Sequence, residues 1–301
     1  MKIIDSPEKY KSFENSRDRM VEVVFKNLRL DPYKFARLLT AKGGEFNNVV
    51  LSGCQIGMSD TNAFTVNLRA GIIGTIDIKN CVFSNVKVDF ISMEPGSTTN
   101  VKISNCRFDN GLLIGKDISH VSIIDSRIDH ISIYCVLRNT FHIINSEIKG
   151  FIMFVRNTPQ VLTGNSLNFI SSRIPLIDFV NPSTTINRVS KNSPLLNSLK
   201  SCKKVCMYTP TFSACDLSDF DAENWEISDS ILIYTSNVEN FNLMRSELLS
   251  SDYGYFTLNI YDDCAGKESM KFPFKDEAEK EHNHSVTDRS DTYTRYIIPV
   301  K

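Results

Sequence analysis

Two aspartates with catalytic potential stand one repeat apart, Asp109 in "RFDN" and Asp129 in "RIDH". If consecutive repeats stack as coils, their carboxylates approach within about 5 Å. Carboxylates on adjacent coils are the acid–base pair that a polysaccharide-cleaving enzyme needs, and His130 adjoins the second. The neighbouring repeats place Ser84 and Lys149 at the same position, and no cleft of basic and aromatic residues converges on the pair. Solvated surface charge is therefore the favoured interpretation, with a carbohydrate-active enzyme as the alternative.

A second candidate centre is Cys264 in "YDDCAGK", which we expect to be the most exposed thiol of the chain. His282, His284 and Asp288 follow in the same polar segment, and a thiol with imidazoles is the inventory of a cysteine-dependent hydrolase or transferase. The two acids directly before Cys264 should raise the pKa of its thiol. The sequence therefore favours an unreactive Cys264 and keeps the cysteine enzyme as an alternative.

Metal, cofactor and nucleic-acid sites are not expected. Cys202, Cys206 and Cys215 offer three thiolates to zinc, but no fourth ligand is apparent and Cys215 fits a repeat position. The sequence has no phosphate-binding loop, dinucleotide fingerprint or basic stripe with interleaved aromatics. Lys and Arg number 34 against 35 Asp and Glu, so the net charge gives no general attraction to nucleic acid or anionic membrane.

The elements that must position these residues repeat along the chain. Each repeat contains a Cys or Ser, which we call the marker, and the residues five before, three before and two after each marker are all apolar. The residue just before the marker forms a polar column, Asn80, Asn105, Asp125 and Asn145, that can hydrogen-bond from coil to coil. The markers are Cys54, Cys81, Cys106, Ser126, Ser146 and Ser172, at spacings of 27, 25, 20, 20 and 26 residues.

Apolar residues also recur at every fifth position through one stretch of the chain: Ile103, Phe108, Leu113, Ile118, Ile123, Ile128 and Ile133. A step of five predicts a coil with four short faces and about 20 residues. One coil cannot bury its own inward side chains, so the coils must stack and pair as parallel strands. The predicted fold is an all-β solenoid, a right-handed parallel β-helix, with the hand expected for parallel crossovers.

This pattern resembles the pentapeptide-repeat proteins over residues 76–155, more loosely over 46–75, and again at Phe212, Leu217, Ala222, Ile227 and Leu232. The chain departs from that family where the position two before the centre is large, as at Val121 and Phe141, so we expect a wider coil. Its degenerate repeats are similar in style to the repeat domain of HECT-like ubiquitin ligase effectors of enteric bacteria. The resemblance implies a bacterial effector or a domain of one, although 301 residues are too few to add the bilobal catalytic part of those ligases.

Three regions are predicted. Residues 1–45 should form a cap of two α-helices, which begin at Ser6-Pro7 and Asp31-Pro32. Residues 46–261 should form the β-helix, interrupted at 181–211 by a long loop with a short helix near 195–199. Residues 262–301 should be a polar, mobile tail that ends in a strand, "TRYIIPV", folded back onto the last coil.

The hypothesis for function is a protein–protein interaction scaffold that binds a protein partner, of unknown identity, through its flat faces and the 181–211 loop. The two enzymes named above are the alternatives. The amino-terminal residues lack a secretory signal, no stretch is long enough to span a membrane, and the cysteine contexts favour reduced thiols. We therefore expect cytoplasmic synthesis, with secretion into a host cell as the accompanying hypothesis.

Overall fold

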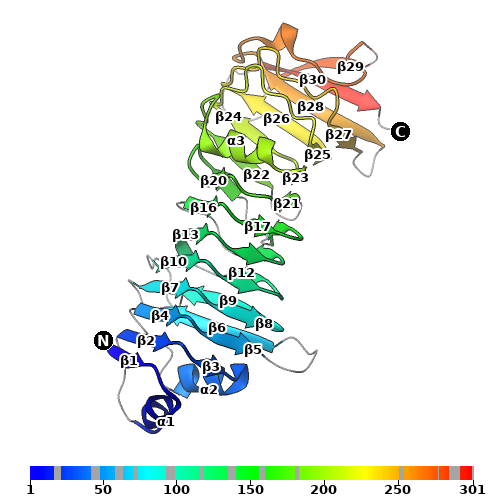
Figure 1. The fold of residues 1–301 in the computed structure, drawn as a ribbon. Helices are drawn as coiled ribbons and strands as arrows, with labels where there is room; N and C mark the ends of the chain where they lie inside the picture. Colours follow the sequence, from blue (N-terminus) through cyan, green and yellow to red (C-terminus); the bar gives the residue numbers. More distant parts are fainter. Residues whose placement is uncertain are drawn as a thin grey trace. The chain divides into compact units, whose positions relative to one another are not determined.

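The computed structural model describes residues 1–16, 22–41, 48–57, 64–70, 74–92, 99–115, 118–134, 140–155, 160–179, 183–250, 254–276, 278–284 and 292–299. Over these residues the chain is an all-β parallel solenoid of about 9 turns with three short α-helices (Figure 1). The predicted solenoid is therefore confirmed. The chain divides into two compact units, unit 1 with residues 1–153 and 169–174 and unit 2 with residues 154–168 and 175–301. The helices are α1 (Pro7–Asn15), α2 (Pro32–Ala41) and α3 (Pro194–Ser201).

The coils of unit 1 contribute strands to three sheets, and neighbouring coils pair in parallel. The first sheet contains β1 (Lys2–Ile4), β2 (Glu22–Lys26), β4 (Asn48–Ser52), β7 (Thr75–Lys79), β10 (Thr99–Ser104), β13 (Ile118–Ile124), β16 (Thr140–Ile144) and β20 (Leu167–Ile170). The second contains β3 (Arg29–Leu30), β5 (Gln55–Gly57), β8 (Val82–Ser84), β11 (Arg107–Phe108), β14 (Arg127–Ile128) and β17 (Glu147–Ile148). The third contains β6 (Phe64–Ala70), β9 (Val86–Ser92), β12 (Leu112–Ile114), β15 (Ile131–Ile133) and β18 (Ile152–Phe154).

The apolar columns set the register of unit 1. Ile103 lies between Ile78 and Ile123 in the first sheet, and all eighteen of the predicted apolar repeat positions are buried. The described strands of unit 1 lie on three faces, and the segments that would carry the predicted fourth face, 116–117 and 135–139, lie outside the described residues. Strand side chains alternate with a period of two, so in β12 the side chains of Leu112 and Ile114 are buried and Leu113, at the predicted fifth position, is half-exposed.

Unit 2 is also a stack of parallel coils. Its longer sheet contains β19 (Gln160–Leu162), β22 (Thr184–Asn187), β24 (Thr211–Ser213), β26 (Ser230–Tyr234), β28 (Tyr255–Tyr261), β30 (Thr292–Pro299) and β29 (Glu279–His284). A second face contains β21 (Leu176–Phe179), β23 (Lys204–Tyr208), β25 (Trp225–Ser228) and β27 (Glu247–Leu249). On the third face single bridges pair Asp216 with Asn237, and Asp221 with Asn242. A 3₁₀-helix, η1 (Lys267–Ser269), lies near its end.

The predicted step of five holds in unit 2 from β24, through the third face, to β25. Phe212, Leu217, Ala222 and Ile227 are fully buried, and the pattern ends in β26, where Ile233 is buried and Leu232 is half-exposed. Each step on the third face consists of one bridged residue followed by a tight turn. In the first turn the amide of Phe220 donates to the carbonyl of Leu217 at 3.1 Å, and Asp219 has a φ of 54°.

Residues 1–45 are only partly helical. Ser6 caps α1 as predicted, and its hydroxyl accepts from the amide of Lys9. Between the two helices, Glu22–Lys26 is not part of a helical cap but the strand β2, whose partners are β1 and β4. Alternate burial in β2, with Val23 and Phe25 inside, suits a sheet better than a helix face. Residues 1–45 therefore contribute strands to the solenoid as well as two helices.

The predicted loop at 181–211 is wrong. It contains β22, which pairs with β19 and β24, and β23, which pairs with β21 and β25. Between them α3 begins at the N-cap Ser193, with Pro194 in its first turn, and buries Leu195, Leu196 and Leu199. The Ser- and Asn-rich composition therefore reflects caps and turns inside the coil.

The polar tail at 262–301 is also more ordered than predicted. Residues 294–299 of the predicted last strand lie in β30, which pairs antiparallel with β28, and β29 then pairs antiparallel with β30. The charged residues of β29, with the sequence "EKEHNH", belong to an edge strand and not to a mobile segment. Charge clustering alone does not separate these two cases.

Candidate functional site

Asp109 and Asp129 lie on adjacent coils of unit 1, as the repeat predicts. Each follows a paired residue of the second sheet, and the amide of Asp129 donates to the carbonyl of Phe108 at 3.1 Å. Each carboxylate has a cation of its own, since Arg107 lies 2.7 Å from Asp109 and Lys149 lies 2.6 Å from Asp129. The two aspartates thus belong to two separate ion pairs on the outer surface.

His130 serves the packing of its coil. Its ring is half-buried, 5.4 Å from the ring of Phe151 with an interplanar angle of 32°. Burial lowers the pKa of His130, nearby Lys87 adds to this, and Asp129 opposes it. Its carbonyl lies so close to Gly111, where φ is 81°, that a Cβ there would stand 2.5 Å from it. His130 therefore closes a tight contact between coils.

Cys264 is buried, contrary to the expectation of an exposed thiol. Its side chain is 6% exposed, and its Sγ lies 3.5 Å from the carbonyl of Ile233. The pKa of Cys264 is raised to about 11, mainly by burial, and Asp263 contributes in the predicted direction. His282 and His284 lie on β29, opposite Thr294 and Thr292 of β30. Asp288, the remaining member of the proposed set, lies outside the described residues.

The three cysteines considered for zinc have separate surroundings. Cys202 follows α3 and donates to the carbonyl of Ser198, whereas Cys215 donates to the carbonyl of Ile186. Burial raises the pKa of Cys206 to about 12, and its hydrogen bond to Glu226 contributes. Nowhere in the described part of the chain are three His, Cys, Asp or Glu side chains placed to hold a metal ion.

An open groove runs along a corner of unit 1, where the marker residues turn the chain from the first sheet to the second. We call it the corner groove. It has a volume of about 750 Å³. It is lined by Asn80, Cys81, Val82, Asn105, Cys106, Arg107, Asp125, Ser126, Arg127, Asn145, Ser146, Glu147, Ser171 and Arg173.

The backbone at this corner explains the polar column. The residue before each marker has a positive φ, between 48° and 65°, which Gly, Asn and Asp adopt most readily. Asn side chains then stack, since Asn105 donates to Asn80 at 2.8 Å and Asn145 donates to Asp125 at 2.6 Å. The predicted amide ladder is therefore confirmed, and the left-handed backbone is a second reason for it. These residues are Gly53, Asn80, Asn105, Asp125, Asn145 and Ser171.

The markers form a second ladder, inside the first. The amide of each marker donates to the sulfur or hydroxyl of the marker in the next coil, for example from Cys106 to Ser126 at 3.1 Å and from Ser126 to Ser146 at 3.0 Å. Each thiol or hydroxyl also donates to the carbonyl two residues earlier, as Ser126 does to Ile124 at 2.7 Å. A small side chain that both donates and accepts satisfies the polar groups of this corner, which accounts for Cys and Ser at these six markers.

A column of charged side chains follows the markers and lines the corner groove. The guanidinium groups are well exposed, with 58% of the Arg107 side chain, 55% of Arg127 and 70% of Arg173 in solvent. Glu147 lies between the last two, 3.3 Å from Arg127 and 3.8 Å from Arg173. Consecutive coils thus present Arg, Arg, Glu and Arg at intervals of about 4.8 Å.

Sequence reasoning missed this column. The residue one after each marker varies in type, and three of its six members are arginines. This variation gives no repeat signal, although all members but Glu147 are exposed. The members are Gln55, Val82, Arg107, Arg127, Glu147 and Arg173.

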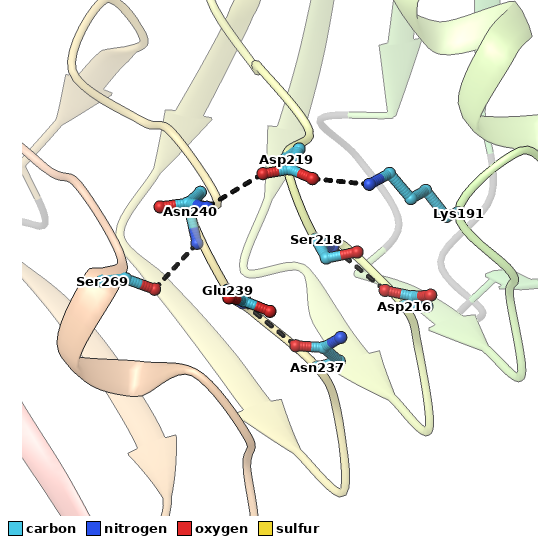
Figure 2. A network of polar contacts seen from close by, with 8 residues as sticks. All are labelled: Lys191, Asp216, Ser218, Asp219, Asn237, Glu239, Asn240 and Ser269. Atoms are coloured by element: carbon cyan, nitrogen blue, oxygen red, sulfur yellow. Dashed lines mark hydrogen bonds and ion pairs between the residues drawn. The ribbon is translucent and has the colours of Figure 1, made fainter.

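Unit 2 has a polar network of another kind, on its five-residue turns (Figure 2). Figure 2 shows Asp219 between Lys191, whose ammonium lies 2.6 Å away, and Asn240, whose amide donates to it at 2.9 Å. The backbone amide of Asn240 donates to the hydroxyl of Ser269 at 3.0 Å. Lys191 lowers the pKa of Asp219, and Asn240 adds to this effect. Since the network joins side chains of neighbouring coils at their turns, it supports the turn geometry.

The two regions therefore differ in what they offer a ligand. The turn network of unit 2 presents an exposed pair of opposite charges, Lys191 with Asp219, whereas the corner groove of unit 1 presents an exposed row of guanidinium groups. Within the described residues, no helix is long and apolar enough to cross a membrane. Comparison of the chain with models of known protein families, with curated proteins and with solved structures found no match.

Proposed function

We propose that the chain is a protein-binding scaffold whose interaction surface is the corner groove of unit 1. The observation that carries this is the charged column, in which four consecutive coils each place one charged side chain in the same groove. Arginine is enriched at protein interfaces and at the residues that dominate their energetics. Extended, evenly spaced presentation of such groups suits recognition of a partner segment.

The backbone under the column supports this proposal. The amide ladder and the marker ladder fix each coil to the next, so the guanidinium groups start from constrained positions. Asp109 and Glu147 then hold Arg107, Arg127 and Arg173 in part, while leaving most of each side chain in solvent. A surface organised before binding loses less conformational entropy when a partner arrives.

The pattern of charge narrows the partner to a protein segment with acidic side chains. Arg127 and Arg173 flank Glu147, so the column is not uniformly positive. A uniform polyanion would meet the carboxylate of Glu147, whereas a protein segment can place a basic or polar residue opposite it. We therefore propose an extended segment in which acidic residues lie opposite Arg107, Arg127 and Arg173.

Two finer features belong to the same proposal. We infer that the solenoid is right-handed, because parallel crossovers almost always are. We also infer that α1 and α2 cover the first coil. In support, the rings of Phe13 and Phe35 lie 6.3 Å and 5.2 Å from the ring of Phe25 on β2. A crystal structure would test both, and a left-handed coil would contradict the first.

The proposal also retains the effector hypothesis, in which the scaffold is made in the bacterial cytoplasm and delivered into a host cell. Its only support is the likeness of the repeat pattern to effector repeat domains. The enzyme hypotheses for Asp109 with Asp129, and for Cys264, stay predictions.

The decisive test is differential capture. The immobilised chain is incubated with eukaryotic and bacterial lysates, beside the variant Arg107→Glu/Arg127→Glu/Arg173→Glu. The matched control is Arg245→Glu, an exposed arginine of unit 2 that pairs with Glu223. We expect a protein retained by the wild type and the control and lost by the triple variant, in eukaryotic lysate if the effector hypothesis holds. Equal retention by the triple variant would place the interaction surface elsewhere.

A further inference from the structure

The marker column of unit 1 begins with three cysteines in successive coils, whereas cysteines in unit 2 alternate with serine. Cys54, Cys81 and Cys106 stand directly above one another, because the residues beside them pair in register, Gln55 with Val82 and Val82 with Arg107. Directly paired positions of adjacent coils have Cα atoms about 4.8 Å apart, within the range of about 4.4 to 6.8 Å that a disulfide requires. The column is therefore a place where neighbouring coils can be joined covalently.

The sulfur atoms of this column already contact the next coil. The amide of Cys54 donates to the Sγ of Cys81 at 3.3 Å, and the amide of Cys81 donates to the Sγ of Cys106 at 3.4 Å. The thiols themselves donate to main-chain carbonyls, Cys81 to Lys79 at 3.2 Å and Cys106 to Ser104 at 3.1 Å. Bond formation thus needs side-chain rotation and a small approach of the two coils.

The two adjacent pairs, Cys54 with Cys81 and Cys81 with Cys106, differ in their access to solvent. Cys81 and Cys106 both line the corner groove, whereas Cys54 does not. Their side chains are only 1% and 5% exposed, so a large reagent is excluded and a small one reaches them from the groove. From this geometry we propose that Cys81 and Cys106 are a redox pair, which a small hydroperoxide converts to a disulfide between adjacent coils.

The order of the two steps follows from the effect of each thiol on the other. The neighbouring Cys81 thiol lowers the pKa of Cys106, whereas Cys106 raises the pKa of Cys81 to about 12. Cys106 is therefore the thiol that attacks the peroxide oxygen. The O–O bond breaks, leaving a sulfenic acid on Cys106 and releasing water from hydrogen peroxide, or an alcohol from an organic hydroperoxide. Cys81 then attacks that sulfur and releases water, so two thiols are oxidised and one peroxide is reduced.

Unit 2 supplies an internal control for this inference. Its markers are Cys215, Ser236 and Cys264, and the amide of Cys215 donates to the hydroxyl of Ser236 at 3.0 Å. The two cysteines are two coils apart, about 9.6 Å, which is beyond the reach of a disulfide. They have the same corner environment and cannot pair.

The experiment treats the reduced, folded chain with one to five equivalents of hydrogen peroxide, blocks the remaining thiols and maps disulfides by mass spectrometry. Two of the eight cysteines should be lost, as a peptide linking Cys81 to Cys106. In Cys81→Ser, dimedone should label Cys106, and in Cys106→Ser neither product should form. Serine occupies the marker position in the next three coils, so both variants are expected to fold.

Three results would overturn the inference. One is that Cys81 and Cys106 stay reduced in the folded chain while added glutathione is oxidised in the same tube. Another is that a bond from Cys54 to Cys81 predominates. The third is that a bond between Cys215 and Cys264 appears as readily, because it requires an unfolded chain. None of these outcomes depends on what the corner groove binds, so this test and the capture experiment fail independently.

Discussion

Unit 1 and unit 2 stack parallel coils but turn their corners differently. In unit 1 the corner consists of one residue with a positive φ followed by one marker, and the strands on either side bury alternate side chains. In unit 2 the third face consists of tight five-residue steps, with bridged residues such as Asp216 and Asn237. The lesson is that apolar residues at every fifth position arise from two geometries, and only the turns distinguish them.

The largest expected effect tests whether residues 181–211 make unit 2 a continuous solenoid like unit 1. Deletion of residues 185–209 should unfold unit 2, because it removes nearly all of β22, all of α3 and β23 and leaves both of its main sheets interrupted. Circular dichroism and limited proteolysis would measure this. Native-like melting of the deletion variant would return the segment to the status of a loop.

A buried charge in unit 1 should have the next largest effect. Ile128 is fully buried in the column between Phe108 and Ile148, so Ile128→Asp should lower the free energy of unfolding by about 4 kcal/mol or more. The control is Ser122→Asp, on the half-exposed side of β13. Chemical denaturation followed by fluorescence gives both values, and equal stabilities would refute the register.

Two leucines sharpen the comparison of the units directly. Leu217 and Leu113 both occupy predicted fifth positions, yet Leu217 is fully buried and Leu113 is half-exposed. Leu217→Ala should cost about 2 to 5 kcal/mol, and Leu113→Ala well under half of that. Urea unfolding of the two variants compares them. If Leu113→Ala lowered the free energy of unfolding as much as Leu217→Ala, Leu113 would face inward, as the four-faced coil predicts for unit 1.

These cases show why the fold was predictable and the corners were not. The apolar columns report burial, and burial fixed the stacking and register of unit 1 from Val49 to Ile174. The composition of residues 181–211 predicts a loop because residues such as Ser193 and Pro194 are common in loops, although here they begin a buried helix. The site could be predicted in part. Asp109 and Asp129 do lie on adjacent coils, but their cations come from side-chain placement that no spacing encodes.

A smaller effect is expected at the corner of unit 1. Asn105 combines a φ of 50° with a hydrogen bond to Asn80. Asn105→Ala loses both and should cost about 1 to 2 kcal/mol, whereas Asn105→Gly keeps the backbone preference and should cost less. Thermal melts of the pair separate the two contributions. Equal losses would mean that the ladder alone matters.

The smallest effect is expected at the marker of the last coil of unit 2. Cys264 should resist iodoacetamide in the folded chain at pH 6 to 9, because its thiol is buried and its pKa is raised to about 11. Since only the thiolate reacts, the rate should rise only as the pH approaches that value. Peptide mapping after timed alkylation measures it. Rapid labelling near pH 6, lost in His282→Ala/His284→Ala, would favour the cysteine enzyme.

The reversal of strand direction at β30 has a consequence for self-association. A parallel solenoid whose last coil is bare offers a template on which an identical chain can add, coil upon coil, into a fibril. In unit 2 that edge of the sheet is β29, reached through the antiparallel strand β30, and its sequence runs Glu279, Lys280, Glu281. A second chain that added a strand at this edge would pair with a strand of alternating charge, after the strand direction has been reversed at β30, and would find no continuing apolar column. The hairpin therefore prevents the repeat from propagating at this edge beyond the molecule.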